Sequence, residues 1–255
     1  MNNKILKKIC GLFGYRLIDK TFFKNNRLIS SYSALSIKKI LSDLFKQNLI
    51  NSIVQIGAND GVRFDDLNEF INRYKVKSLL VEPIKDNFEQ LKNKYNNSDF
   101  VNLENSAISI DNQISFLYKV DNQYLSLYDD HIIGITSFDK KHLLKHGVKN
   151  NHIIKETVNS ITINELLKKY SIDKLDLLYI DTEGYDGKIV IDFLSKTDLD
   201  SIIIFEFIHI DNSIFEKLLL KLQKLNYKVF SINENVICLP ASKNIGINFA
   251  NNQII

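Results

Sequence analysis

Carboxylates occur at points of the chain where short apolar segments end. Asp181 and Glu183 directly follow the apolar run 177–180, and Glu206 lies near the end of the run 201–207. A charged side chain within so apolar a run is costly unless it is paired or lies at the mouth of a strand. Acids placed in this way could accept a proton from a reacting group or bind a divalent cation.

Each of these acids also has a purely structural interpretation. Asp181 or Glu183 could cap the helix that is predicted to begin after Gly184, and Glu206 could be a paired acid of the core. We favour a catalytic role, with Asp181 as the first candidate and Glu183, Glu206 and His209 in reserve.

The segment 55–61, with the sequence QIGANDG, has the composition of a turn that binds a ligand. Its two glycines let the backbone turn tightly and approach a ligand closely. Glu82 ends the next apolar segment, where its carboxylate could accept both hydroxyls of a ribose. An ordinary turn beside a surface glutamate is the alternative. The favoured prediction is a site for an adenosine-containing cofactor. Its residues are Gln55, Gly57, Asn59, Asp60, Gly61, Glu82 and Pro83.

This turn differs from the common nucleotide-binding patterns. A dinucleotide site would have glycine at the third and sixth positions of GxGxxG, where this chain has Asn59 and Val62. The P-loop pattern is missing from the sequence as well. Asp60 would repel a phosphate, whereas it suits an ammonium or sulfonium cation. A dehydrogenase is therefore the weaker interpretation.

Short apolar segments alternate with amphipathic ones, which predicts an α/β protein whose mostly parallel, doubly wound sheet is covered on both faces. The last two strands should form an antiparallel edge. Ligands bind beyond the carboxyl ends of parallel strands, so the candidate residues should meet at one edge. Asp86, Thr162 and Ser213 each precede a glutamate by three residues and are expected to cap helices. The predicted strands are 52–56, 78–81, 100–108, 113–120, 177–180, 201–207, 228–231 and 235–239, and the predicted helices are 36–48, 64–74, 86–95, 162–170, 187–194 and 213–225.

Composition is that of an ordinary globular protein, with 45% apolar and 25% charged residues. The 33 basic and 30 acidic residues are interspersed, so we expect no nucleic-acid partner. Without a Pro/Gly-rich linker, we predict one domain over 49–255 and an N-terminal helical extension over 1–48. Cys10 and Cys238 form no CxxC pair, which favours the cytoplasm.

Four segments together resemble the FkbM-type methyltransferases. They are 54–61 (VQIGANDG), 80–83 (LVEP), 105–108 (NSAI) and 179–186 (YIDTEGYD), in matching order and spacing over roughly residues 50–210. The resemblance implies the Rossmann-like class I methyltransferase fold, with S-adenosyl-L-methionine as the methyl donor. It also implies O-methylation of a hydroxyl on a sugar, a glycan or another natural product.

The resemblance further implies how the methyl donor is held. The turn 57–61 and Glu82 would bind it, with Asn105, Ser106 and Ala107 near its adenine. Methyl transfer from a sulfonium needs mainly the positioning of the two reactants, and a base helps when the acceptor is a hydroxyl. Asp181 would act directly, or as a ligand of a divalent cation such as Mg²⁺. A non-catalytic scaffold that retains the fold is the remaining alternative.

The long segment 121–159 is a candidate lid over the acceptor. It lies between the cofactor motifs and is rich in groups that bond to hydroxyls. His142 and His146 are four residues apart and could share a helix face, for which we favour solvent exposure over a metal pair. The polar and aromatic residues of the segment include Tyr124, Tyr128, His131, Ser137, His142, His146 and His152.

The first 20 residues predict a short basic amphipathic helix. Packing on the domain or on a partner is the favoured interpretation, and peripheral contact with the anionic inner face of a membrane is the alternative. We expect neither a membrane span nor a secretory signal. The apolar stripe comprises Ile5, Leu6, Ile9, Leu12, Phe13 and Leu17, with Lys4, Lys7 and Lys8 elsewhere.

Deleting residues 1–20 is expected to leave the affinity for the methyl donor unchanged, because they lie outside the cofactor motifs. Binding to anionic vesicles should weaken, since the truncated protein lacks the lysines and the apolar stripe. Vesicle sedimentation of both proteins measures this. Equal partitioning would show that the segment is a packing element.

Overall fold

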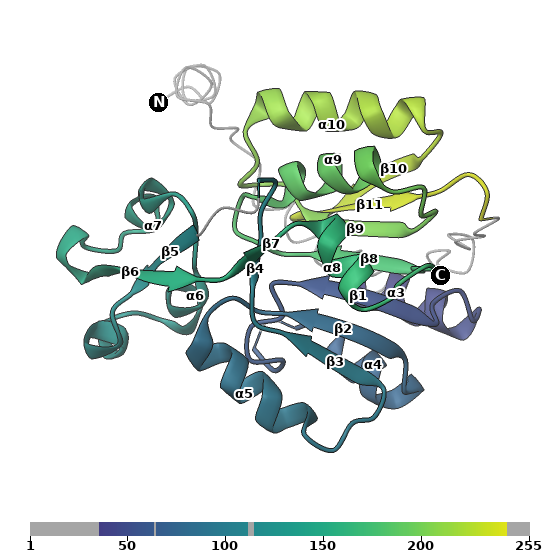
Figure 1. The fold of residues 1–255 in the computed structure, drawn as a ribbon. Coiled ribbons are helices and arrows are strands. Elements are labelled where there is room, and N and C mark those ends of the chain that lie inside the picture. The colour runs from purple at the N-terminus through teal and green to yellow at the C-terminus, as the bar shows by residue number, and fades with distance from the viewer. Residues whose placement is uncertain (1–35, 64, 112–114, 244–255) are drawn as a thin grey trace, which may run out of the picture.

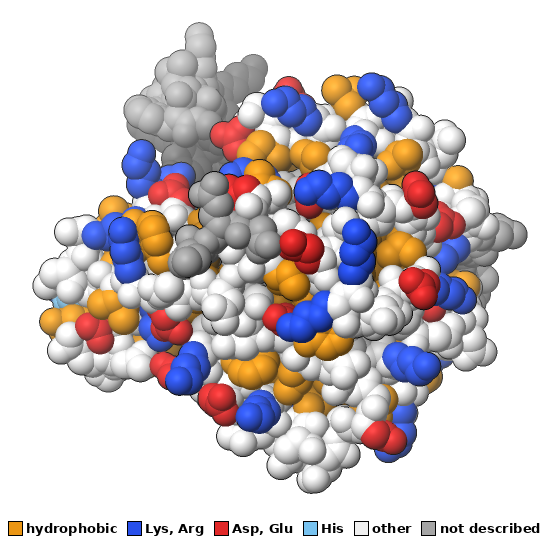
Figure 2. Space-filling model, viewed as in Figure 1, with side chains coloured by type: hydrophobic (Ala, Val, Ile, Leu, Met, Phe, Trp, Pro, Cys, Tyr) orange, Lys and Arg blue, Asp and Glu red, His pale blue; other side chains and the backbone are white. Residues whose placement is uncertain are grey.

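The structure of the protein is a computed structural model, and it describes residues 36–63, 65–111 and 115–243. The helix predicted over 1–20, together with Cys10, lies outside the described residues. Within them, no helix combines the length and the apolar character needed to cross a bilayer. On the face shown in Figure 2, basic and acidic side chains are interspersed, as the nearly balanced composition predicts.

Strands and helices alternate along most of the described chain (Figure 1). The strands are β1 (Ser52–Ile56), β2 (Lys77–Val81), β3 (Val101–Glu104), β4 (Ala107–Ile108), β5 (Ser115–Val120), β6 (Ile153–Val158), β7 (Ser160–Ile161), β8 (Leu177–Ile180), β9 (Ile202–Glu206), β10 (Lys228–Ile232) and β11 (Asn235–Leu239). The helices are α3 (Ile37–Lys46), α4 (Asn68–Tyr74), α5 (Lys85–Tyr95), η1 (Asn122–Leu127), α6 (Asp130–Gly134), α7 (Lys140–Lys145), η2 (Asn150–His152), α8 (Ile163–Lys169), α9 (Asp186–Lys196) and α10 (Asn212–Lys224).

The main sheet has seven strands in the order β10-β11-β9-β8-β1-β2-β3. Neighbouring strands from β9 to β3 are parallel, whereas β11 runs antiparallel to both β9 and β10. The mostly parallel sheet and its antiparallel C-terminal edge are thereby confirmed. From β1 the chain builds outward to β3 and then returns to the other side of β1 with β8. The strand order reverses between β1 and β8, which is where this architecture opens a crevice for ligands.

Alternate side chains of the buried strands enter two separate cores. On β9, Ile202 and Ile204 belong to the cluster that includes α3, α4 and α5. Ile203 and Phe205 point the other way and join α8, α9 and α10. Successive residues of a strand face opposite sides of the sheet, so a strand apolar throughout must be covered twice. The helix α3, which falls within the segment 1–48, packs in the first core.

Residues 115–158 form a side lobe beside the main sheet, visible at the left of Figure 1. Its strands β5 and β6 pair antiparallel over their whole length. A small core of its own contains Val120, Ile135, Leu143 and Val148. Most of this segment was expected to be irregular. The strand β6 was missed because its residues, IIKETV, bury only one apolar side chain completely and lack a clear alternation.

Local capping signals were partly right. Thr162 and Glu165 form the predicted capping box at the start of α8. Asp86 does not cap α5, which begins one residue earlier, and its carboxylate accepts a hydrogen bond from the side chain of Asn122 instead. At α10 the cap is Asp211 rather than the predicted Ser213. An aspartate directly before the first residue of a helix accepts the unpaired N–H groups as well as a serine does. Because Asp211 and Ser213 are both present, the sequence alone does not decide between them.

Gly57→Ala is expected to destabilise the protein by at least about 4 kcal/mol, because an added Cβ would overlap the carbonyl oxygen of Asp181. Gly147 is the matched control. Its φ of +84° is nearly the same as the +85° of Gly57, but no atom lies within 4 Å of the added Cβ. Gly147→Ala should therefore cost only the backbone strain, about 1–2 kcal/mol. Thermal unfolding followed by circular dichroism measures both, and equal losses would contradict the close approach.

Candidate functional site

A cavity of about 470 Å³ opens beside the carboxyl ends of β1, β2 and β8. This volume lies within the ~300–1,000 Å³ range of small-molecule sites. The two groups of residues singled out in the sequence, far apart along the chain, meet in its wall. The predicted residues that line it are Gln55, Gly57, Asn59, Glu82, Pro83, Ser106, Ala107, Asp181, Glu183 and Glu206.

The turn after β1 is joined to the end of β2 through its backbone. The N–H groups of Gly57 and Ala58 both donate to the carbonyl of Val81, each at 3.0 Å. Asn59 has a φ of +50°, a left-handed conformation that asparagine tolerates better than most residues. Its N–H donates to Oε2 of Glu82 at 2.9 Å. The turn and the glutamate therefore form one rigid unit.

Glu82 is buried but keeps capacity to bind a ligand. Oε2 accepts from Asn59, and Oε1 accepts from the N–H of Ile84 at 2.9 Å. Burial raises the pKa of Glu82 to about 7, although these hydrogen bonds act in the opposite direction. The side chain of Asn87 donates to the carboxylate as well. The two carboxylate oxygens together can accept about four hydrogen bonds, so a place for a ribose hydroxyl remains. Glu82 therefore fits the ribose of an adenosine-containing ligand.

Two buried oxygens near the turn have no hydrogen-bond partner among the described residues. They are Oε1 of Gln55 and Oδ2 of Asp65, and both residues line the cavity. The Gln55 amide donates to the other Asp65 oxygen at 3.3 Å. Because unpaired buried acceptors are rare, these two fit a ligand that brings its own N–H donors, such as an ammonium group. Asp65 is not among the residues predicted from the sequence, although it closely follows the glycine turn along the chain.

Four of the predicted site residues do not line the cavity. Asp60 turns back to its own loop, where it pairs with Nε of Arg63 at 2.6 Å. Burial raises the pKa of Asp60, but hydrogen bonds from Arg63 and Val62 outweigh this and keep it low. Gly61 and His209 also lie outside the lining. Asn105 supports the site from behind, since its amide donates to the carbonyls of Glu82 and Pro83.

Asp181 lies directly at the crevice. Its N–H donates to the carbonyl of Ile56 at 2.9 Å, which extends the pairing of β8 with β1. Burial raises the pKa of Asp181 well above its usual range, and the neighbouring carboxylates of Asp186 and Glu183 raise it further. Glu206 behaves similarly, since burial and then Asp181 raise its pKa to about 9.

The turn 182–184 is held by a different acid from those proposed as caps. Asp186 is buried and accepts from the N–H of Gly184 at 3.2 Å and from the hydroxyl of Thr182 at 2.8 Å. The helix α9 has no side-chain cap at Tyr185. Neither Asp181 nor Glu183 caps it, so the structural alternative given for both is wrong.

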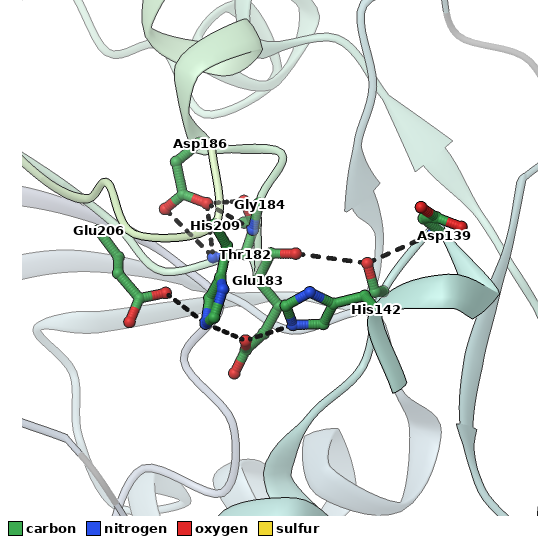
Figure 3. Close-up of polar contacts among 9 residues, drawn as sticks. Asp139, His142, Thr182, Glu183, Gly184, Asp186, Glu206 and His209 are labelled. Carbon is green, nitrogen blue, oxygen red and sulfur yellow. Dashed lines mark hydrogen bonds and ion pairs between the residues drawn. The ribbon is translucent and has the colours of Figure 1, made fainter. Parts of the chain in front are cut away.

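Three histidines, His142, His146 and His209, gather beside this turn, and Figure 3 shows His142 and His209. Oε2 of Glu183 lies 3.1 Å from Nε2 of His142 and 3.6 Å from Nε2 of His209. Burial and then His142 lower the pKa of His209. The solvent-exposed face expected for His142 is wrong, because Leu143 enters the core of the side lobe and turns this side of α7 inward. The ring of His146 contacts both other rings, tilted against His142 and edge-on to His209.

Comparison with known proteins places the chain in a family. Residues 55–229 match the family described as the methyltransferase FkbM domain. No curated protein matches the chain. Similar solved structures include a methyltransferase FkbM from Methylobacillus flagellatus KT, with 10% identity and a TM-score of 0.45 over 74% of this chain and 44% of that one. A putative caffeoyl-CoA O-methyltransferase from Staphylococcus aureus shows 10% identity and a TM-score of 0.43 over 94% and 93%.

The chain belongs to the FkbM methyltransferase family, as its sequence motifs indicate. It is an S-adenosylmethionine-dependent methyltransferase with the Rossmann-like class I fold, and its strand order fits that fold. The dehydrogenase interpretation is thereby set aside. The chain spans less than half of the FkbM structure from Methylobacillus flagellatus KT.

The affinity for S-adenosylhomocysteine is expected to fall as the pH drops below about 7, the pKa of Glu82. The ribose hydroxyls donate to the ionised carboxylate, so a bound ligand opposes protonation, and the loss approaches about tenfold per pH unit. Glu82→Gln should bind at least about tenfold more weakly at pH 8 and lose this pH dependence. Calorimetry between about pH 8 and pH 6 tests both. An unchanged profile in the folded variant would place the ribose elsewhere.

Proposed function

We propose that the protein transfers a methyl group to a hydroxyl of a sugar, a glycan or a related polyhydroxylated product, with Asp181 as the base. The observation that carries this proposal is the position of Asp181. It lines the cavity and its carbonyl touches Gly57, at the turn expected to hold the methyl donor. Donor and acceptor would thus meet where the paired strands β1 and β8 reach their carboxyl ends.

The half of the cavity near β1 and β2 suits the methyl donor. Glu82 would accept the ribose hydroxyls, and Ser106 and Ala107 would lie along the adenine. Gln55 and Asp65, whose unpaired oxygens face no partner among the described residues, would accept the ammonium group of the methionine part. The sulfonium supplies an activated methyl group when it is bound.

The half of the cavity near β8 and β9 suits a hydroxylated acceptor. Its walls carry oxygen atoms from Thr136, Thr182, Glu183, Glu206 and Glu234. Hydroxyls donate well to such groups, and several acceptors around one pocket recognise a ring with several hydroxyls. This composition supports a sugar-like acceptor over a purely apolar one.

Asp181 would hold and deprotonate the attacking hydroxyl. The acceptor oxygen forms its bond to the methyl carbon while the carbon–sulfur bond breaks, and the hydroxyl proton passes to the carboxylate. A carboxylate whose pKa is raised by burial is a stronger base than a solvated one, so its raised pKa supports this role. Glu206 is the neighbouring acid that we keep in reserve.

A Mg²⁺ ion between Asp181 and Glu206 is the alternative way to acidify the hydroxyl. Both residues line the same cavity. A base needs no such ion, so adding Mg²⁺ to the purified protein should leave turnover unchanged. A clear increase with Mg²⁺ would favour the metal role over the base.

The acceptor class is tested with a methyl-labelled donor. Nucleotide sugars and lipid-linked glycans are the first candidates, because they present free hydroxyls on rings. Label should appear as a methyl ether. Label on nitrogen or carbon would overturn the O-methylation part of the proposal while leaving the methyltransferase itself intact.

We also place the reaction in the cytoplasm, and the buried free thiol of Cys238 supports this.

Asp181→Asn is expected to lower turnover by about 10²–10⁴-fold, the usual contribution of a general base. The affinity for S-adenosylhomocysteine should change by less than about threefold, because asparagine keeps the size of the side chain. Asp43→Asn is the control, since Asp43 lies outside the cavity in an exposed ion pair with Lys39. Turnover of Asp181→Asn above about a tenth of the wild type would remove Asp181 from the chemistry.

A further inference from the structure

We propose that His142, His146 and His209 bind a divalent metal ion of the late first transition row, for which Zn²⁺ is the natural probe. One ring nitrogen from each residue lies within 4.8 Å of the others. His142 lies in α7 of the side lobe and His146 directly follows that helix, whereas His209 follows β9 of the main sheet. The metal would join these two parts of the molecule.

The spacing of the three rings matches that of imidazoles around one ion. With metal–nitrogen bonds of about 2.0–2.1 Å, each ring centroid lies about 3.2 Å from the ion; two centroids are then about 4.5 Å apart at a right angle and about 5.2 Å apart at the tetrahedral angle. The observed separations are 4.4 Å for His142 and His209, 4.7 Å for His142 and His146, and 5.2 Å for His146 and His209. Small side-chain rotations would aim the nitrogens at a common point.

Each part of the group is held in place by the surrounding chain. His142 and His146 are four residues apart, so their side chains emerge on the same side of a helix. His209 packs against Gly184, where an added Cβ would lie 2.9 Å from the His209 carbonyl oxygen. Because the backbone is fixed on both sides of the site, ordering the ligand side chains costs little free energy when a metal binds.

Glu183 has the position of a carboxylate that orients metal-binding histidines. Its Oε2 is 3.1 Å from Nε2 of His142, which leaves Nδ1 of that ring as the nitrogen to bind a metal. Ligating histidines nearly always give their second nitrogen to such a partner, which fixes the ring. Figure 3 shows Glu183 between the rings of His142 and His209. Glu183 is therefore assigned as a positioning residue of this site.

The ligand type selects the metal. Three imidazoles favour Zn²⁺, Co²⁺, Ni²⁺ or Cu²⁺, whereas Mg²⁺ and Ca²⁺ require oxygen ligands. Three histidines leave a fourth position for water or for an oxygen of a ligand. Because Glu183 lines the half of the cavity assigned to the acceptor, the open metal position would face the acceptor. This part of the inference rests on the proposed function. The metal binding itself requires neither substrate.

The test uses the full chain without a histidine tag, freed of metal, at neutral pH. Titration with Co²⁺ should give one equivalent of binding with the intense visible absorption of a tetrahedral site, and Zn²⁺ should displace it. Zn²⁺ should also raise the unfolding temperature, by an amount that grows with the logarithm of its concentration over the Kd. These measurements on the wild type need no variant to fold.

Variants then assign the ligands. His142→Ala and His209→Ala should each weaken Zn²⁺ binding at least about 100-fold, and Glu183→Gln about 10–100-fold, as loss of an orienting partner does. His152→Gln is the matched control. It changes a histidine of the same side lobe, whose ring stacks on Tyr124 instead, and should leave the affinity within about threefold.

Two results would overturn the site. One is the absence of stoichiometric binding of Co²⁺ or Zn²⁺ to the folded wild type, and the other is full affinity in both alanine variants. Calorimetry with S-adenosylhomocysteine on the same metal-free protein reads the proposed function separately. If the protein binds metal but not S-adenosylhomocysteine, the metal site stands and the proposed function fails. If it binds S-adenosylhomocysteine but not metal, only the metal site is overturned.

Discussion

The carbonyl of Asp181 lies so close to Gly57 that a side chain at position 57 has no room. This contact joins the carboxyl ends of β1 and β8 where the strand order reverses. It fixes the distance between the turn that suits the methyl donor and the acids that suit the acceptor. Methyl transfer depends chiefly on holding two reactants in line, so a backbone contact is a more effective constraint here than any flexible side chain.

The acids gathered at this edge lower the stability of the fold. Burial and mutual repulsion raise the pKa of Asp181 and bring that of Glu206 to about 9. A carboxyl group whose pKa is raised in the folded state reduces stability at every pH above its unfolded value. Asp186 is fully buried, but hydrogen bonds from the turn 182–184 counteract the effect of burial on its pKa, which rises only to about 6. The same crowding makes the Asp181 carboxylate a stronger base. The interactions that lower the stability of the fold therefore also increase the reactivity of this residue.

Features set by neighbouring residues could be predicted from the sequence, and features set by distant packing could not. The parallel strands, the turn at Gly57 and the carboxylate of Glu82 follow from apolar runs and from glycine where the backbone must turn. The place of His142 beside Glu183 depends on how α7 packs, and 41 positions separate the two residues. Asp65 was missed because only the structure shows that one of its oxygens has no partner among the described residues.

The side lobe explains why the sequence indicates the methyl donor more clearly than the acceptor. The donor half of the cavity is built from strand ends, where backbone geometry restricts which residues fit. The lobe contributes Leu117, Gly134, Thr136 and Phe138 to the wall. It is joined to the rest of the molecule by a buried apolar cluster, in which Leu117 and Val158 pack with Ile84 and Ala107. Polar contacts add to this, such as the 3.3 Å hydrogen bond from the Ser137 hydroxyl to the Glu183 carbonyl. The shape of this wall is therefore set by side-chain packing between segments that are distant in the sequence, whereas the donor half is set by local backbone geometry, and only the latter can be recognised in the sequence.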